Sequence, residues 1–131
     1  MIWTAAFIAA LALWGWRGVV FDVVLEPLQL ASAYTVPRGL NGCTFHVDPA
    51  TATERTAIHE AGHCAGYILW GTAPGAPGDP HHSKNPASVM YSGGSALAIL
   101  PEDFAFARVT WMQWLRKSPR FSQVVVPGLA R

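Results

Sequence analysis

The chain has 131 residues, which is enough for one small domain. Hydrophobic residues make up 51% of it and charged residues only 13%, an apolar composition that indicates a membrane-directed segment. The net charge is +1 without a basic cluster, so we expect no nucleic-acid partner. The two cysteines, Cys43 and Cys64, allow either one disulfide in an oxidising compartment or two buried thiols.

The first part of the chain is apolar on every side. Residues 2–16 carry no charged side chain, and tryptophans followed by Arg17 close the stretch, as at a membrane interface. Fifteen residues are short for a membrane span but suit the core of a signal peptide, and residues 31–33 (Ala-Ser-Ala) have the form of a cleavage site. We therefore expect residues 1–33 to be a signal peptide or a membrane anchor that associates with a membrane through residues 2–16. A buried N-terminal helix of the globular domain is the alternative.

Two short elements precede the central helix. Residues 19–25 are rich in β-branched side chains and fit either a strand or an extension of the apolar helix. Residues 37–42 contain proline and glycines and indicate a loop, and the alternation in residues 44–47 predicts a strand. The Thr-x-x-Glu pattern at residues 51–54 has the form of a capping box and predicts a helix that ends by residue 71.

That helix carries the sequence His59-Glu60-Ala61-Gly62-His63, which reads H-E-x-x-H. His59 and His63 are four residues apart, so they lie one turn apart on one face and can hold one Zn²⁺. Glu60 then sits beside the metal, where a carboxylate can take a proton from a bound water. The alternative is that both histidines are ordinary helix residues.

The chain after the helix is a long loop, a turn and a second helix. Residues 71–86 are dense in proline and glycine and predict a loop that contains His81 and His82. A tight turn is predicted at residues 92–94. A second helix is predicted from Pro101, with acids in its first turn, to the Ser-Pro pair at residues 118–119.

Together these pieces resemble the metzincin metalloproteases, and matrixin-like members most closely. The signature of the family is H-E-x-x-H-x-x-G-x-x-H, followed by a turn that carries a methionine. His59, Glu60, His63 and Gly66 match this signature, whereas Leu69 stands where the third histidine is expected.

The next part of the family pattern reappears further along the chain. Residues 82–91 read H-S-K-N-P-A-S-V-M-Y and match the matrixin-like string H-S-x-(D/N)-P-x-S-V-M-Y. An insertion of thirteen residues, 82 minus 69, would move the third ligand from Leu69 to His82. The resemblance therefore implies that Zn²⁺ is held by three histidines: His59, His63 and His82.

The resemblance also implies the roles of the other site residues. Glu60 would be the catalytic general base that accepts a proton from the zinc-bound water, and Met90 would lie in a structural turn beneath the metal. Three alternatives for the third ligand stay open from the residues alone: His81, Asp79 and Glu102.

The implied fold is α+β, a minimal metzincin-like (zincin) domain behind an N-terminal apolar helix. Residues 34–118 would hold the active-site helix, a short sheet, the Met-turn and a C-terminal helix, and residues 119–131 a tail. The strand at residues 44–47 would match the family's edge strand, which pairs with extended substrate. A disulfide between Cys43 and Cys64 would stabilise so small a domain.

The implied function is that of a zinc endopeptidase, secreted or membrane-anchored, which hydrolyses bonds in a peptide or protein substrate. The alternative is a non-catalytic membrane-anchored or surface domain that keeps a zinc-binding scaffold. The missing histidine at Leu69 and the short chain favour this alternative.

Overall fold

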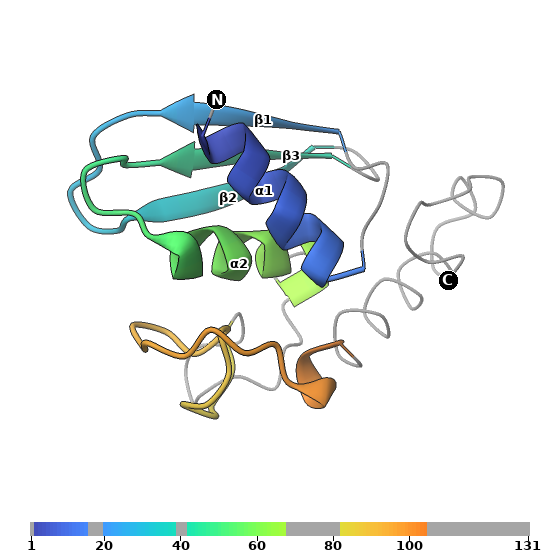
Figure 1. The fold of residues 1–131 in the computed structure, drawn as a ribbon. Coiled ribbons are helices and arrows are strands. Elements are labelled where there is room, and N and C mark those ends of the chain that lie inside the picture. The colour runs from blue at the N-terminus through green and yellow to red at the C-terminus, as the bar shows by residue number, and fades with distance from the viewer. Residues whose placement is uncertain (1, 16–19, 39–41, 68–81, 105–131) are drawn as a thin grey trace, which may run out of the picture.

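The structure, a computed structural model, describes residues 2–15, 20–38, 42–67 and 82–104. It is a mixed α+β fold with a small sheet, in agreement with the predicted class (Figure 1). A helical turn also begins at Pro101, as predicted. The elements are, in chain order, α1 (Ile2–Leu13), β1 (Val20–Leu25), β2 (Ala33–Arg38), β3 (Gly42–Val47), α2 (Glu54–Gly62) and the π-helical turn η1 (His63–Tyr67).

The three strands form one sheet in the order β1-β3-β2, in which β1 runs parallel and β2 antiparallel to β3. The predicted strand at residues 44–47 is confirmed within β3. However, β3 is the central strand, so the expectation that it forms the edge is wrong, and β2 occupies that edge. Pro37 also belongs to β2 rather than to a loop, because an edge strand tolerates a residue without an N–H group.

One face of the sheet carries the core, and both helices pack on it. The Phe7 ring of α1 stacks on the Phe45 ring of β3, with 4.0 Å between the ring centroids. Trp14, just after α1, donates from Nε1 to the carbonyl oxygen of Ile58 in α2 over 2.9 Å. These contacts join α1 to both the sheet and the central helix. Figure 1 shows the position of α1 beside the sheet.

The N-terminal segment is therefore packed as a core element. The Phe7 side chain is 0% exposed, and β1 is hydrogen-bonded to the centre of the sheet. This packing corresponds to the buried-helix alternative for the N-terminal segment, whereas removal of residues 1–33 as a signal peptide stays a prediction. Within the described part of the chain, no helix has both the length and the apolar character that a membrane crossing needs.

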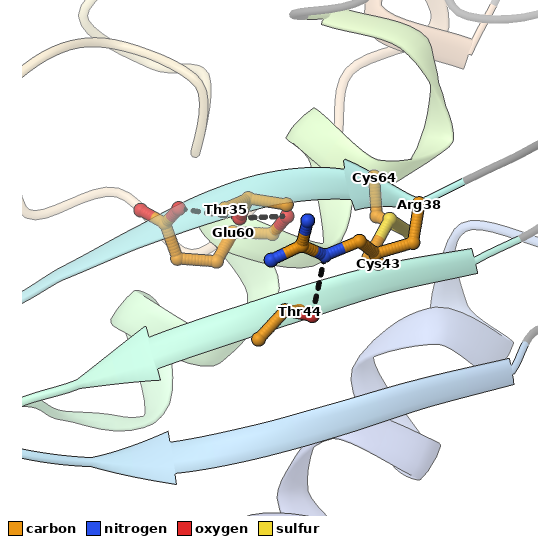
Figure 2. The surroundings of a disulfide bond; sticks show 6 residues. All are labelled: Thr35, Arg38, Cys43, Thr44, Glu60 and Cys64. Atoms are coloured by element: carbon orange, nitrogen blue, oxygen red, sulfur yellow. Dashed lines mark hydrogen bonds between the residues drawn. A yellow bond between two sulfur atoms is a disulfide. The ribbon is translucent and has the colours of Figure 1, made fainter.

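A disulfide joins Cys43 of β3 to Cys64 of η1, with 6.0 Å between the two Cα atoms (Figure 2). Of the two cysteine states that the sequence allows, the structure has the disulfide. It links the central strand to the turn that follows α2, and it closes a loop with a sequence separation of 21. A loop of this length limits the unfolded chain enough to contribute about 3 kcal/mol to stability.

The entry into α2 differs in detail from the predicted cap. The helix begins at Glu54 after Thr53, whose backbone N–H donates to the Thr56 hydroxyl over 2.9 Å. The predicted capping pair at residues 51 and 54 is therefore wrong by two positions. The carboxylate of Asp48 holds the preceding turn, because its Oδ1 accepts the N–H of Ala50 over 3.0 Å.

Candidate metal centre

Two ligands come from the same face of the central helix. His59 lies in the last turn of α2, and His63 is the first residue of η1. Their Nε2 atoms lie 3.2 Å apart. A tetrahedral zinc with Zn–N bonds of 2.0–2.1 Å holds two nitrogens about 3.3 Å apart, so this spacing suits a shared metal ion.

The third histidine of the cluster is His82, as the displaced motif predicts. Its ring centroid lies 5.1 Å from that of His59 and 5.0 Å from that of His63. One ring nitrogen from each histidine falls within 4.8 Å of the others, so the three residues are close enough to bind a metal ion. Among the described residues, this cluster is the group of side chains that could hold a metal ion.

Of the three alternative third ligands, the structure describes only Glu102. His81 and Asp79 lie outside the described residues, as does Leu69. Glu102 is exposed and accepts a hydrogen bond from the Asn85 side chain over 3.3 Å, so it is not part of the histidine cluster.

The ring of His59 is oriented by the backbone of a turn far away in the sequence. Its Nδ1 lies 2.7 Å from the carbonyl oxygen of Val89. Because a carbonyl oxygen only accepts, Nδ1 must carry the hydrogen. In a neutral imidazole this leaves the lone pair on Nε2, which is the nitrogen that faces His63. A carbonyl partner of this kind is the usual support of a metal-binding histidine.

The turn at residues 88–91 is itself held from two directions. The N–H of Ser83, next to His82, donates to the Met90 carbonyl over 2.9 Å. The hydroxyl of Ser88 donates to the buried carboxylate of Asp103 over 2.7 Å and accepts from the Met90 N–H over 2.9 Å. The sequence indicated only that Asp103 is a first-turn acid of a helix, and this contact with the turn was not predicted.

Met90 is fully buried and packs against the middle of the H-E-x-x-H motif. A Cβ atom at Gly62 would overlap the Met90 sulfur and the ring of Trp14. The glycine inside the motif is therefore required by the close approach of the turn and of the residue that follows α1. The position of Met90 beneath a bound metal stays a prediction.

Substitution of Gly62 by alanine should destabilise the protein, although alanine favours a helix by about 1 kcal/mol. The added methyl group overpacks the contact with Met90 and Trp14, and overpacking costs about 1–3 kcal/mol. Urea unfolding of metal-free protein measures this difference in the free energy of unfolding. Gly62→Ser, with a larger side chain, should lower the free energy of unfolding further. A Gly62→Ala protein more stable than the wild type by about 1 kcal/mol, the full gain in helix propensity, would contradict the close contact.

Glu60 lies in the same motif and is 6% exposed. The hydroxyl of Thr35 in β2 is 2.6 Å from Glu60 Oε1 and 3.2 Å from the Glu60 carbonyl oxygen, and it donates to the carboxylate (Figure 2). Burial raises the pKa of Glu60 to about 7, and the hydrogen bond from Thr35 lowers it in part. A carboxyl group with a pKa near neutrality is suited to accept and return a proton.

Thr35 was missed at the level of the sequence. It precedes Glu60 by 25 residues and belongs to no motif. Only the pairing of β2 with β3, which directs the side chain of Thr35 toward α2, brings the two residues together. A polar residue within a short strand gives no sequence signal of such a contact.

Thr35, Glu60 and the three histidines line a cleft of about 530 Å³. One side of it is the edge strand β2 with the residues just before it, and His59, Glu60 and His63 come from the central helix. His82 and the turn at residues 92–93 also contribute to the lining. The volume is within the usual range of ligand sites, so the histidine cluster faces a space that can receive another molecule.

Comparison of the chain with protein-family models, with curated proteins and with solved structures finds no match.

Proposed function

We propose that this protein is a zinc-dependent endopeptidase of the matrixin-like metzincin kind, built on a minimal zincin fold. The observation that carries the proposal is the convergence of His59, His63 and His82 in a cleft that also contains Glu60. The Met-turn and the displaced third histidine of the sequence pattern are both consistent with it.

The donor set fits zinc. Three neutral imidazoles match the ligand preference of Zn²⁺, and a catalytic site of this type keeps one further coordination position open. The Val89 carbonyl leaves Nε2 of His59 available, as zinc requires. When bound, zinc supplies Lewis-acid chemistry that activates water and polarises a peptide carbonyl.

The residues of the chain supply the proton transfer and the orientation. Glu60 takes the proton of the attacking water and returns it to the amide nitrogen of the leaving group, acting first as base and then as acid. Thr35 holds one carboxylate oxygen of Glu60 in place. The burial of Glu60 keeps its proton affinity near the value that such a shuttle needs.

The substrate would be an extended peptide or protein segment. The edge strand β2 borders the cleft, and it contributes Tyr34 and Thr35 to the lining. Because the outer edge of β2 is not paired within the described sheet, a substrate strand can add to it through main-chain hydrogen bonds. The edge-strand role that the resemblance assigned to residues 44–47 thus passes to β2.

We also propose an extracytoplasmic location, secreted or membrane-anchored. The disulfide supports it, because disulfides persist in oxidising compartments.

Purified wild-type protein should contain one zinc per chain and cleave unstructured peptides, whereas His82→Ala should bind zinc more than about 100-fold more weakly. This loss exceeds the roughly 10–100-fold that follows removal of a group hydrogen-bonded to a ligand, because here the ligand itself is lost. Elemental analysis and competition with a chelator measure it. His46→Ala is the matched control, since His46 stacks on Tyr34 and lies outside the cluster, and it should retain its zinc.

Other outcomes would separate the alternatives. If His82→Ala kept its zinc, the third ligand would be another group, and His81, Asp79 and Glu102 would be tested next. Zinc binding with no peptidase activity on any peptide would favour the non-catalytic scaffold. Absence of zinc from the wild type, with zinc gained in Leu69→His, would indicate a site that has lost its metal.

A further inference from the structure

Arg55 lies one turn before His59 on α2 and belongs to no motif of the sequence. Its side chain is half-buried, and its guanidinium group is bonded to backbone carbonyl oxygens. Nη2 donates to the carbonyl of Val89 over 3.0 Å and to that of Tyr91 over 2.6 Å, and Nε donates to that of Ala96 over 3.0 Å. One side chain thus holds three points of the segment that follows His82.

The Val89 carbonyl links the hydrogen bonds of Arg55 to the candidate metal centre. The same oxygen accepts a hydrogen bond from His59 Nδ1 over 2.7 Å. A carbonyl oxygen has two lone pairs and can accept both bonds. Because Arg55 and His59 are four residues apart, their side chains lie on the same face of the helix and reach the same turn.

We infer that Arg55 is a positioning residue of the metal centre: it holds the turn at residues 88–91 against α2, so that the Val89 carbonyl fixes the ring orientation and tautomer of His59. The effect extends to the next residue of the turn. The Met90 carbonyl accepts the N–H of Ser83, the neighbour of His82. One guanidinium group therefore supports ligands from two distant parts of the chain. The inference rests on the metal site of the proposed function.

The chemistry of arginine explains why this side chain suits the position. A guanidinium group is planar and presents several N–H donors in a fixed arrangement, whereas a lysine ammonium is a compact point charge. It is a cation, so it supports the site through the carbonyl dipoles and not as a ligand. The chain just after the turn also lies close to Arg55. A Cβ atom at Gly94 would be 3.0 Å from the Tyr91 ring and 3.5 Å from Arg55 Nη2.

The test compares Arg55→Met and Arg55→Lys with the wild type. We expect Arg55→Met to bind Zn²⁺ about 10–100-fold more weakly, the range for loss of a group that orients a metal ligand without touching the metal. We expect Arg55→Lys to be weakened too, since it keeps the charge and loses the planar donor set. The absorption spectrum of the Co²⁺-loaded protein should also change, because it reports the ligand geometry. Arg38→Met is the control, since Arg38 bonds to Thr44 on the sheet, and it should match the wild type.

A second measurement does not need a metal. Nitrogen NMR of the His59 ring in metal-free protein at mildly alkaline pH should show the Nδ1–H tautomer in the wild type and a mixture in the Arg55 variants. Wild-type zinc affinity or an unchanged tautomer in Arg55→Met would overturn the inference. If that variant did not fold, Arg55→Lys would be judged by the same two criteria. If wild-type protein bound no zinc, the proposed function would fail, and the tautomer alone would decide the role of Arg55.

Discussion

Replacement of Glu60 by glutamine should reduce peptidase activity at least about a thousandfold while the protein keeps its zinc. Glutamine has the same shape and can still accept the Thr35 hydrogen bond through its amide oxygen, but it cannot take the proton of water. General acid–base catalysis contributes about 10²–10⁴-fold, and here one group serves both steps. A fluorogenic peptide assay gives kcat/KM, and elemental analysis of the same sample gives the zinc content.

The same variant has a signature in stability that does not depend on a substrate. In metal-free protein the pKa of Glu60 is raised from 4.5 to about 7, so the folded state holds a proton that the unfolded state releases between these values. The free energy of unfolding therefore falls as the pH rises through this window, by about 3 kcal/mol from this group. The difference between wild type and Glu60→Gln should show this slope, whereas the common contributions of the histidines cancel.

Two results would contradict these roles of Glu60. Activity within about tenfold of the wild type in Glu60→Gln would exclude a general base at this position. A pH-independent difference in stability would mean that the carboxyl group is solvated rather than buried. Loss of zinc together with activity would instead show that Glu60 supports the ligands, and the kinetic comparison would then be made at saturating zinc.

The histidine cluster was predictable because its signals are local. The spacing of His59 and His63 follows from the helical repeat, and the helix was indicated by the Thr-x-x-Glu pattern just before it. His82 was located by the continuous match of residues 82–91 to the family string. The turn within these residues brings His82 near Met90. Each of these inferences needs only a few neighbouring residues, and the structure brings the three histidines together.

The surroundings of the cluster were not predictable, because they depend on contacts between distant segments. Thr35 meets Glu60 only because β2 lies at the edge of the sheet, and strand order is not visible in a single strand. The same holds for Arg55 and Asp103, which read as a helix residue and a first-turn acid. Their partners are backbone carbonyls and a hydroxyl of the turn at residues 88–91, and those groups have no sequence pattern.

The N-terminal segment was ambiguous for a different physical reason. A helix with no charged residue is equally suited to a lipid environment and to a protein core, since both exclude water. The composition of residues 2–16 therefore predicts that they are shielded from water, but not whether lipid or the protein core shields them. The sheet and α2 supply that shielding, because the Phe7 ring lies on Phe45 of β3 and the Trp14 ring lies against Gly62 of α2.

Removal of residues 1–33 should leave a chain that does not fold cooperatively. It deletes α1, β1 and the residue Trp14 between them, and with them the buried side chains of Phe7 and Trp14. Loss of one large aromatic side chain from a core costs about 3–5 kcal/mol, and the total stability of a domain is about 5–15 kcal/mol. Loss of the Trp14 bond to Ile58 and exposure of the open side of β3 add to this cost. Circular dichroism during heating of residues 34–131 and of the full chain makes the comparison.

Point variants separate the core role of α1 from its apolar character. Phe7→Ala should lower the free energy of unfolding by about 3–5 kcal/mol, because that side chain is 0% exposed. Ile8→Ala, at a neighbouring side chain that is 58% exposed, should change it by no more than about 0.5 kcal/mol. A cooperative transition and bound zinc in residues 34–131 alone would show that the first 33 residues are dispensable. The prediction that they are a removable signal peptide would then be the better account of this segment, and the packing of Phe7 on Phe45 would not be needed for the metal centre.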